Sequence, residues 1–168
     1  AYLVHARISS IYAYRKLYQY AINHADKANQ YALMSSNSYY VVSSYNCLAR
    51  AYSSQKDYEK AIKFYDKAIE IGRVHNKTKL VNSSIQEKMG LFIRQNRLEE
   101  AQNLVKTLNH QMLNNQANLT IGRLYYRLNQ PDSAYYYLNR AIKSNNIYTQ
   151  QSAYQALFYL SRKQKDYE

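Results

Sequence analysis

Apolar residues recur along the chain at steps of three and four, which places them on one face of an α-helix. Leu48 and Tyr52 lie four residues apart, and Ala61, Tyr65 and Ala68 follow at steps of four and three. The pattern therefore predicts amphipathic helices that occur in consecutive pairs.

The pattern is repeated along the sequence around four alanines at intervals of 40, 40 and 33 residues: Ala21, Ala61, Ala101 and Ala134. A phrase such as Tyr45-x2-Leu48-Ala49-x2-Tyr52 precedes each alanine, with substitutions. Because self-similarity at such a period marks stacked units of one fold element, we expect units at about 2–37, 38–77, 78–114 and 115–147, with a partial unit at 148–168.

The third and fifth units depart from this pattern. In the third, Lys88 stands where Leu is expected, and alignment on Met89-Gly90 breaks the spacing to Ala101. We therefore expect either a shortened turn or a slightly re-registered helix there. In the fifth, Lys165-Asp166-Tyr167-Glu168 copies residues 56–59, so we expect the chain to be part of a longer protein.

These phrases resemble the tetratricopeptide repeat, which has an aromatic, Leu-Gly and Tyr on one helix and Ala and an aromatic on the next. The resemblance covers nearly the whole chain. It implies an all-α fold, an α-solenoid of stacked antiparallel helix pairs in a right-handed superhelix, with about four full repeats plus a half repeat in one domain, 1–168. The 40-residue interval exceeds the usual 34 and predicts longer helices; HEAT-type pairs of about 40–47 residues are the alternative architecture.

Several residues predict where helices begin, end or pack closely. Pro131 fits the first position of a helix, Asp57 is a candidate N-cap, and Asn96-x-x-Glu99 is similar to a capping box. Gly72 is expected to end its helix. Gly122 lies inside a helix, where Gly costs about 1 kcal/mol relative to Ala, and we expect close packing to be the reason.

Composition excludes several classes of protein. The 3 Gly and 1 Pro are too few for the turns of an all-β fold, and 1 Cys excludes a disulfide framework. No apolar run approaches the roughly 20 residues of a membrane span. Of the 21 Tyr, nine lie at repeat-signature positions and are expected to pack in the core: Tyr12, Tyr18, Tyr45, Tyr52, Tyr58, Tyr65, Tyr125, Tyr154 and Tyr167.

Candidate chemistry is sparse. His5, His24, His75 and His110 show no metal-ligand spacing, and we expect His5 and His24 to be packing or surface residues. Cys47 has no neighbouring His or Lys to lower its pKa and is expected to be a small buried residue. The three glycines form no phosphate-binding loop. We therefore predict that the chain is not an enzyme and holds neither a cofactor nor a metal.

The resemblance also implies a ligand-binding groove, because tetratricopeptide families hold ligands on the concave face lined by the first helix of each pair. Carried over to this chain, the groove residues are Arg7, Ser10 and Tyr14, then Asn46, Arg50 and Ser53, then Gln86 and Arg94, and finally Arg123, Tyr126 and Arg127. If these phases hold, Arg50, Arg94, Arg123 and Arg127 give the groove a positive lining. Arg binds carboxylate or phosphate bidentately, so the expected partner is a protein or peptide segment that is acidic or has a free carboxylate. A solvated polar face without a ligand is the alternative.

The leading hypothesis is a non-catalytic protein- or peptide-binding scaffold. The Tyr- and Asn-rich texture and the Pro-Asp-Ser-Ala-Tyr phrase are similar to tetratricopeptide regions of bacterial signalling and regulatory proteins. This resemblance implies the sensor or interaction region of a larger, membrane-anchored bacterial regulator, in an extracytoplasmic (periplasmic) location. The formal charge of +12 keeps an alternative open, binding of single-stranded nucleic acid by a basic helical-repeat groove. A third hypothesis is an accessory region of an enzyme.

Overall fold

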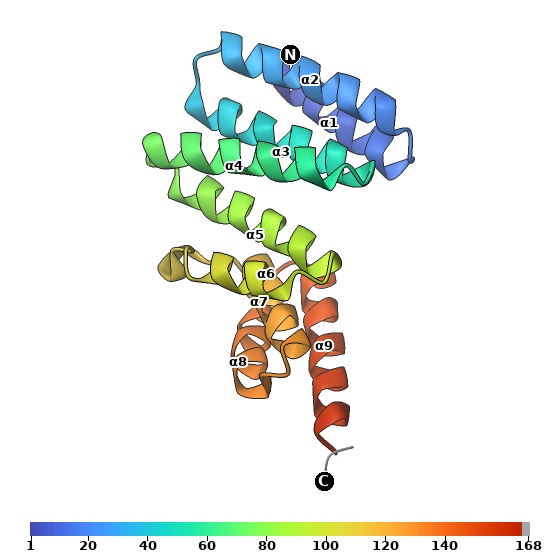
Figure 1. The fold of residues 1–168 in the computed structure, drawn as a ribbon, viewed down its shortest axis with the longest axis vertical. Helices are drawn as coiled ribbons and strands as arrows, with labels where there is room; N and C mark the ends of the chain where they lie inside the picture. The colour runs from blue at the N-terminus through green and yellow to red at the C-terminus, as the bar shows by residue number, and fades with distance from the viewer. Residues whose placement is uncertain (166–168) are drawn as a thin grey trace. The chain divides into compact units, whose positions relative to one another are not determined.

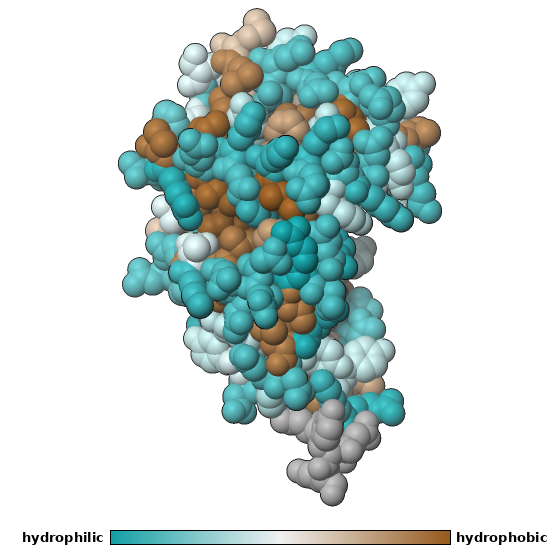
Figure 2. All heavy atoms as spheres, viewed as in Figure 1, coloured by the Kyte–Doolittle hydropathy of each residue, from teal (hydrophilic) through white to brown (hydrophobic). Residues whose placement is uncertain are grey.

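The computed structural model describes residues 1–165 and is helical throughout its regular elements. It divides into two compact units, Ala1–Leu91 and residues from Phe92 onward. Residues 166–168, which complete the copied phrase of the fifth repeat and include Tyr167, lie outside the described part. The face drawn in Figure 2 is largely hydrophilic, with hydrophobic residues in separate patches.

Two helix pairs make up most of the first unit. Helices α1 (Tyr2–Tyr14) and α2 (Tyr18–Met34) pack together, as do α3 (Ser38–Ser54) and α4 (Tyr58–Val74) (Figure 1). Helix α5 (Thr78–Arg94) follows and crosses the boundary between the units. The core joins α2 to α3 through Ala21, Ile22, Ala25, Cys47, Leu48 and Ala51.

The second unit contains the remaining helices. They are α6 (Leu98–Val105), the 3-10 helix η1 (His110–Met112), α7 (Asn115–Arg127), α8 (Pro131–Ala141) and α9 (Ile147–Lys165). Helix α7 packs on α8 and α9, and α6 packs on α7. The core contains Leu119, Ala134, Leu138, Ala141, Ala153 and Leu160. The predicted all-α fold with antiparallel helix pairs is confirmed.

Small residues stand at the repeated positions of the helix pairs. The four repeated alanines are fully buried, at 0% exposure: Ala21, Ala61, Ala101 and Ala134. A Cβ on Gly122 would lie 2.7 Å from Cδ2 and Cγ of Leu138 on α8, which confirms that close packing explains this glycine. The 40-residue interval is taken up by helix length, since α3 and α4 have 17 residues each whereas α7 and α8 have 13 and 11.

The turns between helices share one backbone device. In five of them a residue with positive φ follows the helix, and the next amide donates to a carbonyl five residues earlier, as from Asp57 N to Tyr52 O at 3.0 Å. This is the Schellman arrangement, which is usually closed by glycine. Here the positive-φ residues of these turns are not glycines: Lys16, Lys56, Asn76, Asn96 and Asn129.

Two predicted helix boundaries are wrong. Gly72 does not end its helix; it is buried inside α4, its added Cβ would lie 2.7 Å from Cγ2 of Val81, and Asn76 takes the positive φ instead. Asn96 does not cap α6, because it occupies the turn before the cap, with φ 61°. The other two predictions are confirmed: the Asp57 carboxylate accepts from Lys60 N at 3.2 Å, and α8 begins at Pro131.

The third repeat keeps the register of the second, so neither a shortened turn nor a re-registered helix occurs. The amide of Arg97 donates to Phe92 O at 2.9 Å, as Asp57 does to Tyr52 forty residues earlier. Lys88 therefore does occupy the Leu position, and its ammonium lies 2.6 Å from the Asp66 carboxylate on α4. The third repeat becomes irregular only in its second helix, since α6 already ends at Val105. Just beyond this end, the Thr107 hydroxyl donates to the Leu104 carbonyl. Such a side-chain hydrogen bond competes with those of the helix backbone.

Most signature tyrosines pack as predicted, but Tyr154 does not. Tyr65 is 2% exposed, and Tyr12, Tyr45, Tyr52 and Tyr125 pack against the cores. Tyr154 is 55% exposed on α9. Within residues 1–165 no second helix follows α9 to cover that face.

We expect Gly122→Ala to destabilise the second unit, because its Cβ would collide with Leu138. Overpacking costs typically 1–3 kcal/mol, from which the roughly 1 kcal/mol gained in helix propensity is subtracted, so the net loss should reach about 2 kcal/mol for a close collision of this kind. Urea unfolding measures it. In a double-mutant cycle with Leu138→Ala, the collision is relieved and the two costs should not add; additive costs would mean that Gly122 is not limited by Leu138.

The positive φ at Lys56 predicts that Lys56→Gly stabilises the first unit by about 0.5–1 kcal/mol, since glycine adopts this conformation without a Cβ penalty. The matched control is Lys63→Gly, in the exposed middle of α4, which should destabilise by about 1 kcal/mol. Thermal melts of both variants measure whether each substitution raises or lowers the stability. A loss of stability in both variants would contradict the positive φ assigned to Lys56.

Candidate functional site

All predicted groove residues lie on the first helices of their pairs. Helix α1 contains Arg7, Ser10 and Tyr14; α3 contains Asn46, Arg50 and Ser53; α5 contains Gln86 and Arg94; α7 contains Arg123, Tyr126 and Arg127. Arg7, Arg94 and Tyr14 are exposed, whereas Ser53 and Gln86 are half-buried. The Ser10 hydroxyl donates to the Ala6 carbonyl of its own helix at 3.1 Å.

Asn46 lies inside the fold rather than on an open face. Its side chain is 4% exposed, and its Oδ1 has no hydrogen-bond partner in the described structure. Asn118 on α7 has the same property, at 2% exposure. A buried polar atom without a partner costs stability, and Asn46 is not placed to touch a ligand at the surface.

Arg50 is held by a neighbouring first helix. Its Nη1 lies 2.9 Å from Oε1 of Glu87 on α5, and the Tyr65 hydroxyl donates to the other Glu87 oxygen at 3.0 Å. Burial opposes the charge on Arg50, but the Glu87 carboxylate outweighs it and keeps the pKa of Arg50 above its ordinary value. The charge of Arg50 is therefore largely balanced within the first unit.

Arg127 supports a turn of its own unit. Its Nη1 donates to the Ile93 carbonyl at 2.6 Å, and its Nη2 donates to Asn96 Oδ1 at 2.8 Å. Ile93 is one of the last residues of α5, where carbonyls lack helical donors and a cation is favourable. The guanidinium thus closes the end of α5 and fixes the turn that contains Asn96.

Arg123 and Tyr126 lie together at a hollow of about 260 Å³ between α7 and α9. The hollow is lined by Arg123, Tyr126, Ser152, Gln155, Ala156 and Tyr159. The ammonium of Lys163 lies 5.5 Å from the centroid of the Tyr126 ring. In the described part of the chain, no carboxylate forms an ion pair with Arg123. Of the predicted groove arginines, Arg123 is therefore the one whose charge faces a hollow without a carboxylate beside it.

The α9 residues of this hollow were missed from the sequence, although a signal for them was present. Matching residue 165 to Lys56 makes α9 another first helix, with Gln155 at the position of Asn46 and Tyr159 at the position of Arg50. A consistent application of the repeat would have named both. Whether Arg50, Arg94, Arg123 and Arg127 share one groove stays a prediction.

The other candidate chemistry is limited. Cys47 is buried as predicted, at 2% exposure, and burial raises the pKa of its thiol. In residues 1–165, no three His, Cys, Asp or Glu side chains gather in a way that could hold a metal ion. No helix in that part of the chain has both the length and the apolar character needed to cross a membrane.

Comparisons with known proteins agree with this geometry. Residues 42–72 and residues 116–148 each match a model of the tetratricopeptide repeat. The search of the curated proteins returned no match.

Solved structures with the same fold include the nearly identical TPR-like repeats of a candidate kinesin light chain from Podosopora anserina, with TM-score 0.67 and 15% identity over 96% of this chain and 89% of that one. A variant of those repeats with a glutamine replaced by methionine matches with TM-score 0.68 over the same shares of the two chains, again at 15% identity. The apo form of RapI matches with TM-score 0.67 and 16% identity over 96% of this chain and 52% of RapI.

The helix pairs, their small-residue contacts and their shared turns define a helical-repeat protein. With the two family matches, the chain contains tetratricopeptide repeats. The matches favour this architecture over the HEAT-type alternative.

The contacts of Arg127 and Arg123 predict different effects on stability. Arg127→Ala removes two charge-assisted hydrogen bonds at an exposed site and should lower the free energy of unfolding by about 1 kcal/mol. Arg123→Ala, on the same helix and without such contacts, should change it by less than about 0.5 kcal/mol. Chemical denaturation of the two variants checks the contrast; equal effects would contradict the roles assigned here.

Proposed function

We propose that this chain is a non-catalytic scaffold that binds a protein or peptide segment, and that the hollow between α7 and α9 is a binding site. The observation that supports it most directly is the lining of the hollow, where Arg123 occurs together with Tyr126 and Tyr159. Tetratricopeptide repeats, present at residues 42–72 and 116–148, are consistent with such a scaffold.

The lining indicates the chemistry of the ligand. A guanidinium binds a carboxylate through two parallel hydrogen bonds, the aromatic rings offer flat apolar surface at low entropic cost, and Ser152 and Gln155 supply polar groups that can hydrogen-bond a peptide. We therefore propose a peptide segment in which an acidic side chain or a terminal carboxylate lies next to an apolar side chain.

The proposal extends to the setting of the scaffold. The repeat texture described above supports the sensor or interaction region of a larger bacterial regulatory protein, and an extracytoplasmic location belongs to the same proposal. Single-stranded nucleic acid is the less favoured ligand, because two of the four arginines that suggested a basic groove already have partners within the chain. Arg50 pairs with Glu87, and Arg127 donates to the Ile93 carbonyl and to the Asn96 side chain.

The binding site can be tested with peptides selected on the wild-type chain from a random display library. Arg123→Glu should weaken a selected peptide by about tenfold to a hundredfold, the loss expected for a charge-assisted hydrogen bond. Lys143→Glu is the matched control, because it makes the same change of charge in the same unit at an exposed residue outside the hollow. Fluorescence polarisation with labelled peptide measures both.

Two outcomes would oppose the proposal. If Arg123→Glu and Lys143→Glu bind the selected peptides equally well, the α7–α9 hollow is not the site. If the wild-type chain selects no peptide but binds labelled oligouridine with an affinity that falls steeply as salt rises, nucleic acid is the ligand.

A further inference from the structure

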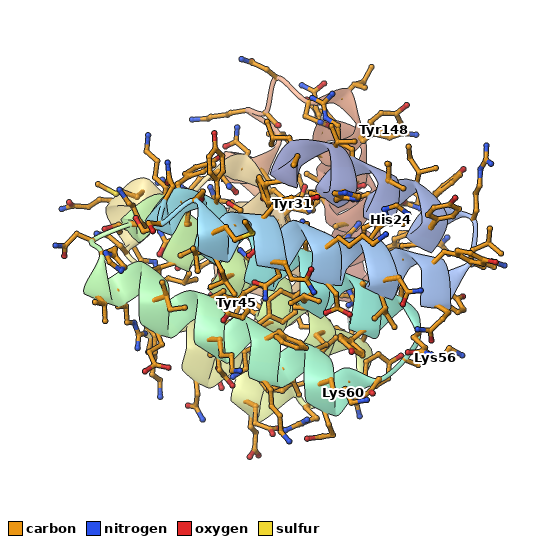
Figure 3. The ribbon with its side chains drawn as sticks, turned by 90° about the horizontal axis from the view of Figure 1, so that it is seen from above. His24, Tyr31, Tyr45, Lys56, Lys60 and Tyr148 are labelled. Atoms are coloured by element: carbon orange, nitrogen blue, oxygen red, sulfur yellow. The ribbon has the colours of Figure 1, made fainter. Side chains whose placement is uncertain are left out.

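A histidine pair joins the two helices of the first repeat. His5 on α1 and His24 on α2 face each other with their Nδ1 atoms 3.0 Å apart and their ring centroids 5.1 Å apart. Figure 3 labels His24 on α2, which lies against α1. Both residues are half-buried, so the pair is fixed by packing and still reachable from solvent.

Aromatic rings hold both imidazoles in place. The Tyr31 ring stacks on His5 at 5.5 Å with 8° between the planes, and the Tyr12 ring lies 5.5 Å from that of His24 at 31°. A rigid pair of ligands loses little freedom when an ion binds, which favours binding. The two nitrogens are therefore held 3.0 Å apart before any ligand arrives.

The separation of the nitrogens fits two ligands on one transition-metal ion. With metal–nitrogen bonds of about 2.05 Å, a 3.0 Å separation corresponds to an angle of about 94° at the metal. That is close to the 90° between neighbouring ligands in square-planar and tetragonal sites, the geometry of Cu²⁺ and Ni²⁺. A tetrahedral ion would need the nitrogens about 3.3 Å apart.

The number of protons on a neutral pair also suits a metal. In a neutral pair, one Nδ1 donates to the other, and each ring has one proton. When both Nδ1 atoms bind a cation, each proton resides on Nε2, so no proton has to leave the neutral pair.

We propose that His5 and His24 form a two-histidine site for a divalent transition metal, preferentially Cu²⁺, that links α1 to α2. Cu²⁺ is preferred because it forms the most stable complexes among the divalent first-row ions. Water completes the coordination, since no third His, Cys, Asp or Glu of the described residues gathers with the pair to form a metal site.

Titration of the chain with Cu²⁺, followed by calorimetry and electron paramagnetic resonance, tests the site. The wild-type chain should bind one Cu²⁺ tightly, with a spectrum that shows two equatorial imidazole nitrogens. His5→Gln and His24→Gln should each weaken this site by about tenfold or more, because chelation by two positioned ligands is lost. His75→Gln is the matched control, since His75 is a single exposed histidine, and it should bind like the wild type.

Three results would overturn the proposal: a one-imidazole spectrum in the wild type, an unchanged affinity in His24→Gln, or an equal loss in His75→Gln. Circular dichroism of each variant establishes that it is folded. If either substitution in the pair unfolds the chain, the spectrum of the wild type alone decides, because it reports the number of imidazoles without any mutation.

Discussion

The close approach of the two helices in the α1–α2, α3–α4 and α7–α8 pairs is the constraint on which the rest of the structure depends. Alanines with no exposed surface stand at the same position of four repeats, and between α7 and α8 the approach is so close that a Cβ on Gly122 would meet Leu138. Large apolar residues such as Leu48, Ile121 and Leu138 are fully buried in the same cores. Small residues at the crossing and large ones around it give dense packing.

This contact also determines which sides of the first helices stay uncovered by their partners. Each second helix covers one side of its partner, so another side of the first helix is left for the next first helix or for solvent. Helices α7 and α9 are consecutive first helices that contact each other, and the hollow with Arg123, Tyr126 and Tyr159 lies between them. The site is therefore a product of stacking, since neither helix forms it alone.

The sequence predicts the helix pairs well because each pair repeats the same local pattern, and errors in one copy are corrected by the others. It fails where one residue type serves two physical purposes. Glycine suits both a positive φ and a tight helix contact. Gly72 lies at a tight helix contact, whereas the positive φ after this helix belongs to Asn76. Asn suits both an N-cap and a left-handed turn conformation, and Asn96 adopts the left-handed conformation.

The candidate site was only partly predictable for a different reason. Helical phase places Arg50, Arg123 and Arg127 on first helices, but it does not show what each guanidinium meets across space. Glu87, 37 residues from Arg50, balances one of these charges, and Ile93, 34 residues from Arg127, engages another. Such pairings depend on neighbouring repeats, so they become visible only when the helices are stacked.

The most direct test of the binding account is to map a bound peptide on the chain by nuclear magnetic resonance. Amide and side-chain signals would be followed while a peptide selected on the wild-type chain is added. We predict that the largest shift changes fall on α7 and α9, around Arg123, Tyr126, Gln155 and Tyr159. Changes confined to the second helices α4 and α8, with α7 and α9 unaffected, would contradict it.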